Sequence, residues 1–177
     1  MRKFVYAISS LALALSLVMT LGVPVFACNG SRWTGGGSVF TADGMRVTHG
    51  FEIYAVTSGE DNIPTAGPNN LEVNWGGNHF HLLDLTWVSS YYTPSLGGPQ
   101  PPPKSVDNVL IGKGTGRYNG VDGAYIEFTF TDQGEPGNND TAQMEIWDAD
   151  GNVVLNVGYA TPLQFGNHQS HLLTGNK

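Results

Sequence analysis

The chain has 177 residues, a formal net charge of −7 at pH 7 and only 13% charged residues. An acidic sequence without a basic run is poorly suited to bind nucleic acid or anionic lipid through charge. The 24 glycines and the lack of any amphipathic helical stretch indicate a turn-rich β protein, and the length suits a single domain.

The first 27 residues have the pattern of a secretory signal peptide. A basic start at Arg2 and Lys3 is followed by an apolar run to about Val25 and by the small residue Ala27. The run is close to the length of a membrane span, so a membrane anchor is the alternative, but Pro24 and Ala27 favour cleavage. We therefore expect a secreted protein of the extracellular space or the cell surface.

Cys28 would be the first residue of the mature chain, and it is the only cysteine. An internal disulfide is therefore excluded. Bacterial lipoproteins carry their lipid on a cysteine at this position. The sequence Val25-Phe26-Ala27-Cys28 resembles the lipobox that directs this modification, although Phe26 is bulky for its place. Lipidation of Cys28 and ordinary cleavage after Ala27 both stay open, and membrane contact is expected only through the signal peptide or such a lipid.

A short linker over residues 28–37 is expected to lead into one domain over residues 38–177. In this domain short segments alternate apolar and polar side chains and are separated by turn residues. The predicted strands are Ser38–Phe40, Met45–Val56, Leu71–Trp75, His79–Val88, Ile111–Arg117, Ala124–Thr131, Ala142–Trp147, Val153–Leu155 and Asn167–Leu173. The proline- and glycine-rich segment 93–104 is predicted to be a surface loop. About nine short strands predict an all-β fold, namely a single antiparallel β-sandwich of the jelly-roll or Ig-like type.

Several short motifs follow one another in a set order along the mature chain. They are Thr34-Gly35-Gly36-Gly37, Gly50-Phe51, Asn70-Leu71-Glu72-Val73, the run from Gly114 to Gly120, the loop Thr131–Gly137 with Asp140, and Gly166-Asn167-His168-Gln169-Ser170-His171. In this order they resemble the bacterial surface module called the post-COAP domain. The resemblance implies an extracellular β domain of no established activity, often a terminal module of larger surface proteins, and it supplies no catalytic residues. This chain differs in standing alone behind a signal peptide and in its many histidines.

The histidines are candidate metal ligands. His79 and His81 are spaced i, i+2, which places both rings on one face of a strand, and His49 lies in the apolar stripe of a neighbouring predicted strand. Such imidazoles could share a zinc or copper ion, with His168 or His171 as a further ligand. The alternative is packed or exposed histidines without a metal, because no cysteine or carboxylate completes the ligand set by spacing alone.

The loop after the strand Ala124–Thr131 is a candidate calcium site. It offers the oxygen-bearing side chains of Asp132, Glu135, Asn138 and Asp140, and oxygen is the donor that calcium prefers. The alternative is that these side chains accept hydrogen bonds from the loop's own backbone, as Asp and Asn commonly do in turns.

Three aromatic residues are candidates for ligand binding. Trp147 points away from the apolar side of its strand, and Tyr125 and Trp87 are further candidates for surface positions. Exposed aromatic rings with nearby amides suit sugar rings. The alternative is that these rings pack against loops or a second layer.

Known catalytic patterns are missing from the sequence. There is no Gly-x-Ser-x-Gly elbow, no His-Glu-x-x-His motif and no phosphate-binding loop, so we expect no enzyme. A hydrolase with paired carboxylates from neighbouring strands is the remaining enzymatic alternative. The sequence thus predicts a non-catalytic module for adhesion or assembly, with an unknown surface protein or glycan as partner. A carbohydrate- or metal-binding module is the alternative to that function.

Overall fold

The computed structural model describes residues 30–58, 61–96, 105 and 107–173. The predicted signal peptide, Cys28 and most of the proline-rich segment lie outside these residues. The strands are β1 (Ser31–Phe40), β2 (Arg46–Ala55), β3 (Thr57–Ser58), β4 (Ile63–Pro64), β5 (Asn70–Trp75), β6 (Asn78–Tyr91), β7 (Val109–Tyr118), β8 (Val121–Thr131), β9 (Thr141–Trp147), β10 (Val153–Pro162) and β11 (Phe165–Leu172). A short 3-10 helix, η1 (Pro94–Leu96), follows β6. No helix in the described part has the length and hydrophobicity needed to cross a membrane.

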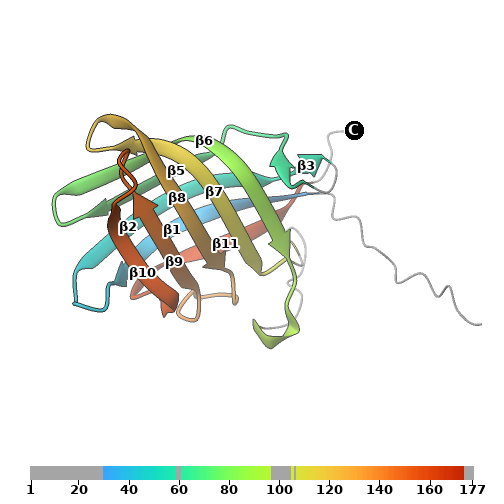
Figure 1. Cartoon of the computed structure of the whole chain (residues 1–177). Coiled ribbons are helices and arrows are strands. Elements are labelled where there is room, and N and C mark those ends of the chain that lie inside the picture. The colour runs from blue at the N-terminus through green and yellow to red at the C-terminus, as the bar shows by residue number, and fades with distance from the viewer. Residues whose placement is uncertain (1–29, 59–60, 97–104, 106, 174–177) are drawn as a thin grey trace, which may run out of the picture.

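The main sheet contains nine antiparallel strands in the order β10-β9-β8-β7-β6-β5-β2-β1-β11. Strands β5 to β10 form a meander, and β1 lies between β2 and β11, so the first strand of the sheet pairs with the last (Figure 1). The all-β antiparallel prediction is confirmed. In place of the predicted two-layer sandwich, however, one sheet curls into a half-barrel (Figure 1). Residues 31–37, predicted as linker, belong to β1.

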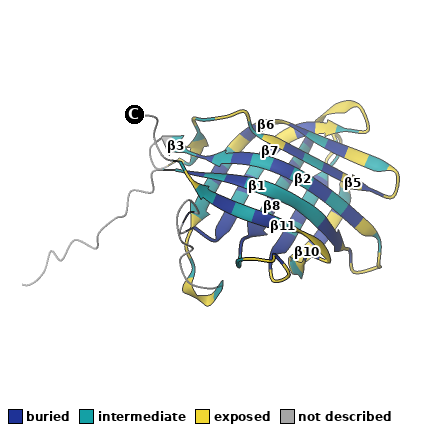
Figure 2. Cartoon of the chain, turned by 180° about the vertical axis from the view of Figure 1, so that it is seen from behind, coloured by how far each residue is buried: buried dark blue, intermediate teal, exposed yellow. Residues whose placement is uncertain are grey.

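The curl brings strands that are distant in the sheet into contact across the interior. Phe130 of β8 stacks on Phe51 of β2 with ring centroids 4.5 Å apart, although three strands separate β8 from β2 in the sheet. His168 of β11 lies against the same two rings. The core is therefore the inner face of one sheet packed against itself, and buried positions alternate with more exposed ones along the strands (Figure 2).

Glycine occupies three successive inward-facing positions of β7, and this makes the close packing feasible. Gly112, Gly114 and Gly116 are all buried, and the space where a side chain would begin is filled by residues of β6 and β8. The ring of Phe128 covers Gly112, and the ring of Phe80 covers Gly116. Because these three positions lack Cβ atoms, β7 accommodates large side chains from both neighbouring strands.

Candidate binding face

The outer face of strands β6 to β9 brings the three predicted aromatic residues together. Tyr125 of β8 lies directly opposite Trp147 of β9, and their ring centroids are 5.6 Å apart. Trp87 of β6 lies opposite Lys113 of β7, which in turn lies opposite Glu127 of β8. Paired residues share a face of a sheet, so these side chains form two adjacent rows on the solvent side. All three aromatic residues are half-buried.

A polar network lies between these rings. Lys113 Nζ donates to Glu127 Oε1 at 2.9 Å, and the Tyr125 hydroxyl donates to the same oxygen at 3.1 Å. The hydrogen bond from Lys113 holds the pKa of Glu127 below its usual range, while partial burial and the Glu127 charge raise the pKa of Tyr125. At neutral pH the face therefore presents an ammonium, a carboxylate and a phenol in fixed positions beside an aromatic pair.

Two hollows continue this face along the strands. The larger has a volume of about 300 Å³, and the smaller, of about 80 Å³, lies over Lys113, Glu127 and Glu145. Both are lined by Ile111, Thr129 and Gln143, which form one cross-strand row of β7, β8 and β9. At its far end the larger hollow is lined by Tyr91, Leu96, Tyr159 and neighbouring residues. The two hollows therefore adjoin each other, and we use the word groove for them together with the neighbouring surface of Tyr125 and Trp147.

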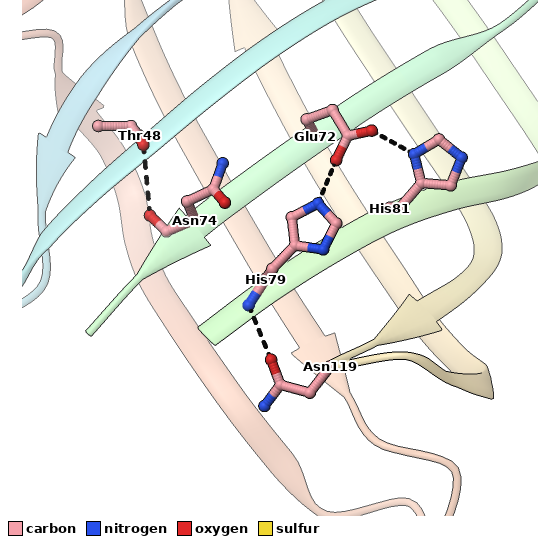
Figure 3. Close-up of polar contacts among 6 residues, drawn as sticks. All are labelled: Thr48, Glu72, Asn74, His79, His81 and Asn119. Carbon is pink, nitrogen blue, oxygen red and sulfur yellow. Dashed lines mark hydrogen bonds and ion pairs between the residues drawn. The ribbon is translucent and has the colours of Figure 1, made fainter. Parts of the chain in front are cut away.

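The predicted metal-binding histidines lie in separate places, away from this groove. On the outer face of β5 and β6, Glu72 lies between His79 and His81, and each of its carboxylate oxygens contacts one imidazole nitrogen (Figure 3). The i, i+2 spacing does place both rings on one face, as the sequence predicts. His171 of β11 contacts the Thr34 hydroxyl at 3.0 Å instead of joining them.

His49 and His168 form a pair inside the core. Their Nε2 atoms are 2.8 Å apart, and His168 Nδ1 contacts the Thr131 carbonyl oxygen at 3.1 Å. Because a carbonyl only accepts, His168 donates from Nδ1, and its Nε2 accepts the proton that His49 carries on Nε2. His49 Nδ1 is then a buried acceptor, and none of the described residues forms a hydrogen bond with it. Burial lowers the pKa of His49 to about 4; burial and the neighbouring His49 lower the pKa of His168 to about 3. Both rings are therefore neutral at pH 7.

These positions do not bring the predicted metal ligands to one point. His49 and His168 face the interior, whereas His79 and His81 face the solvent. Within the described residues, no group of three or more His, Cys, Asp or Glu side chains is arranged to hold a metal ion. Binding of zinc or copper stays a prediction from the sequence.

The candidate calcium loop is hydrogen-bonded to the backbone of β11. Asp140 accepts hydrogen bonds from the backbone N–H groups of Gln133 and His168, at 2.7 and 2.8 Å. Asp132 accepts from those of Gly134 and Ser170, at 3.0 and 2.9 Å. All four carboxylate oxygens of two buried side chains thus serve the backbone of this loop and of β11. The calcium prediction stays untested, and these contacts give Asp132 and Asp140 a structural role.

The other two candidate calcium ligands lie outside this arrangement. Glu135 Oε1 accepts from Asn167 Nδ2 at 3.2 Å and from Gln169 Nε2, and Asn138 is exposed. The loop and the closing strand, which carry two of the motifs in the resemblance described above, are therefore in direct contact.

Comparison with known proteins gives no relative. No family model, curated protein or solved structure matches this chain. The resemblance to the post-COAP domain consequently stays an expectation.

Sequence reasoning missed several residues of the groove. Lys113, Glu127, Gln143 and Tyr159 were not among the predicted site residues, because their proximity depends on strand register and on the fold of β10. The sequence signal for these residues was their position on the polar side of strands with an alternating apolar and polar pattern. Outward residues of neighbouring strands in a meander form rows.

Proposed function

We propose that this protein is a non-catalytic extracellular binding module and that the outer face of β6 to β9 binds carbohydrate. The observation that carries the proposal is the grouping of Trp87, Tyr125 and Trp147 on one solvent-facing surface, next to the fixed polar groups of Lys113 and Glu127. Aromatic rings offer a flat apolar surface to the face of a sugar, and charged or amide groups beside them bind its hydroxyls. The signal-peptide pattern of residues 1–27 supports an extracellular place of action.

Single alanine substitutions test this proposal. Tyr125→Ala and Trp147→Ala should each weaken binding to a recognised polysaccharide by on the order of tenfold, because each removes one stacking surface. Tyr54→Ala is the matched control. Tyr54 is a half-buried tyrosine on the outer side of β2, and three strands lie between β2 and β8 in the curled sheet, so this residue lies outside the proposed binding face.

The measurement is affinity electrophoresis in gels that contain single polysaccharides, with circular dichroism to verify that each variant is folded. Retardation of the parent protein and of Tyr54→Ala, but not of the other two variants, is the expected result. If no polysaccharide retards the parent, the carbohydrate proposal fails, and a protein partner on the same face becomes the next hypothesis.

A further inference from the structure

We infer that the groove takes a linear, uncharged polysaccharide chain that runs parallel to strands β7 to β9. This inference rests on the proposed carbohydrate function and adds the class of ligand, its direction and its length. It follows from the repeat of the cross-strand rows and from the charge of the groove.

The rows follow one another at regular intervals along the strands. The first pairs Tyr125 with Trp147, the second pairs Glu127 with Glu145, and the third pairs Thr129 with Gln143. The fourth holds Tyr91, Val109 and Thr131. Successive rows are two residues apart, so the first and fourth are separated by three steps, or about 20 Å at the usual rise of a strand. This length exceeds a single sugar ring several times.

The chemistry of the rows changes in a way that suits a chain more than a single sugar. The first row offers an aromatic platform, and the second offers the charged groups of Lys113 and Glu127. The third row combines the apolar Ile111 with the hydroxyl of Thr129 and the amide of Gln143. At the end of the groove, Tyr159 projects into solvent with 86% of its surface exposed. Aromatic surfaces thus stand at both ends with hydrogen-bonding groups between them.

The charge of the groove selects against anionic chains. Lys113 is already paired with Glu127 at 2.9 Å, which leaves Glu145 in the same row and Asp84 beside the first row as carboxylates. The whole chain is acidic as well, with a net charge of −7. A polysaccharide that carries uronate or sulfate groups would bring like charges together, whereas neutral hydroxyl groups both donate to carboxylates and accept from the lysine.

A comparison of neutral and anionic probes tests the charge argument. The parent protein is run in gels that contain a neutral polysaccharide, namely a mixed-linkage β-glucan, a glucomannan or a galactomannan, and in gels that contain polygalacturonate or alginate. Retardation by at least one neutral polysaccharide and by neither anionic one is expected. Retardation by an anionic polysaccharide alone would overturn the inference while the carbohydrate proposal itself survives.

Oligomers of the bound polysaccharide test the length and the direction. By calorimetry, the hexamer should bind at least tenfold more tightly than the trimer, because only the longer chain reaches both ends of the groove. Trp147→Ala should weaken the binding of hexamer and trimer, whereas Tyr159→Ala should weaken the hexamer alone. Tyr159 is so exposed that its replacement leaves the core intact. The measurement on Tyr159→Ala therefore tests the extended groove even if Trp147→Ala is unstable.

Other outcomes separate the two proposals. Equal affinities for trimer and hexamer, or indifference of the hexamer to Tyr159→Ala, would reduce the site to the Tyr125 and Trp147 end and refute the extended groove. Absence of binding to every polysaccharide would refute both proposals.

Discussion

The buried imidazoles of His49 and His168 show how two polar side chains are accommodated in an aromatic core. His49 stacks on Phe130 at 5.1 Å between ring centroids, and His168 lies against Phe51 at the same separation. Burial among these apolar rings favours neutral imidazoles, and protonation of both rings would direct the N–H at Nε2 of His168 against the N–H at Nε2 of His49. The core therefore accommodates the pair best while both rings are unprotonated.

The first prediction concerns the pH dependence of stability. The folded protein keeps both histidines neutral until about pH 4 and 3, whereas in the unfolded chain they bind protons from about pH 6.5 downwards. Stability is thus fully present above pH 6.5 and is lost as the pH falls. Burial raises the pKa of Asp140 to about 6. Near pH 5 this carboxyl is therefore protonated in the folded protein but ionised in the unfolded chain, which partly offsets the loss of stability caused by the histidines. With two protons bound by the unfolded chain and one by the folded protein, the free energy of unfolding should fall by about 1.4 kcal/mol per pH unit near pH 5.

Urea unfolding at several pH values between 6.5 and 4.5 measures this slope. In His49→Phe, which replaces one imidazole by a ring that fits among Phe51 and Phe130, the slope should drop toward zero, since His168 and Asp140 then oppose each other. Val121→Ala alters an exposed side chain that does not titrate, and it serves as the control that keeps the parent slope. A parent protein whose stability does not change over this range would contradict the neutral buried pair.

Among the strands, β7 is the one over which side chains of both neighbouring strands pack most closely. Three of its inward positions, 112, 114 and 116, are glycine, so the side chains of Phe80 and Phe128 from its two neighbours lie over its backbone. A Cβ at Gly112 would overlap the ring of Phe128, which is itself packed on Phe130 at 4.9 Å between centroids. The displacement of one ring would therefore propagate into the centre of the core.

The second prediction follows for that position. Gly112→Ala should destabilise the protein by about 1–3 kcal/mol, the usual cost of adding a methyl group to a filled core. Gly158→Ala in β10 is the matched control, because a Cβ there meets no atom within 4 Å. Thermal or urea unfolding of both variants measures the difference. If Gly112→Ala and Gly158→Ala are equally stable, the glycines of β7 have no role in the packing of the core.

The same strands show what the sequence could and could not predict. Alternation identified most strands, including the meander from β7 to β10, because one face of each strand is buried. Alternation does not say which strands are neighbours, so one curled sheet and two stacked sheets give the same pattern. The alternate glycines at 112, 114 and 116 were the local signal for close packing over β7.

For the candidate site, the limits of prediction were similar. The outward positions of Tyr125 and Trp147 follow from the parity of their strands. Their contact, and the nearness of Lys113 to Glu127, depend on register, which only the folded sheet supplies. The burial of His168 opposite Gly35 depends on the pairing of the first strand with the last, and no local pattern reveals it.

At the scale of the whole molecule, the sheet joins the first and the last of the described strands. Ser31 of β1 pairs with Leu172 of β11, and Trp33 pairs with Ser170. Beyond this pairing, β11 is the last strand of the sheet, and the carboxylates of Asp140 and Asp132 bind its N–H groups at His168 and Ser170. These aspartates occupy the place that a further strand would take, and so they protect the edge.

The third prediction is that β11 is an integral part of one cooperative unit. A chain that ends at Gln164 loses one of the two strands that pair with β1, exposes Phe51 and Phe130, and leaves Asp132 and Asp140 each without one hydrogen-bond donor. Unpaired buried groups of this kind cost about 1–3 kcal/mol each, and the loss of core burial adds to that, so the total should exceed the stability of a typical domain of this size. The truncated chain should lack the near-ultraviolet circular dichroism of packed aromatic rings, while a chain that ends at Leu173 should keep it.

A synthetic peptide of residues 165–173 separates loss of the strand from general damage. Because an extended peptide can add to an open sheet edge through its backbone, the peptide should restore the near-ultraviolet signal of the truncated chain in a saturable manner. A peptide in which His168 is replaced by aspartate should fail to do so, since it would place a charge among Phe51, Phe130 and the buried Asp140. If the truncated chain instead unfolds at the same temperature as the control, β11 is an accessory strand, and the half-barrel is stable without the pairing of its two ends.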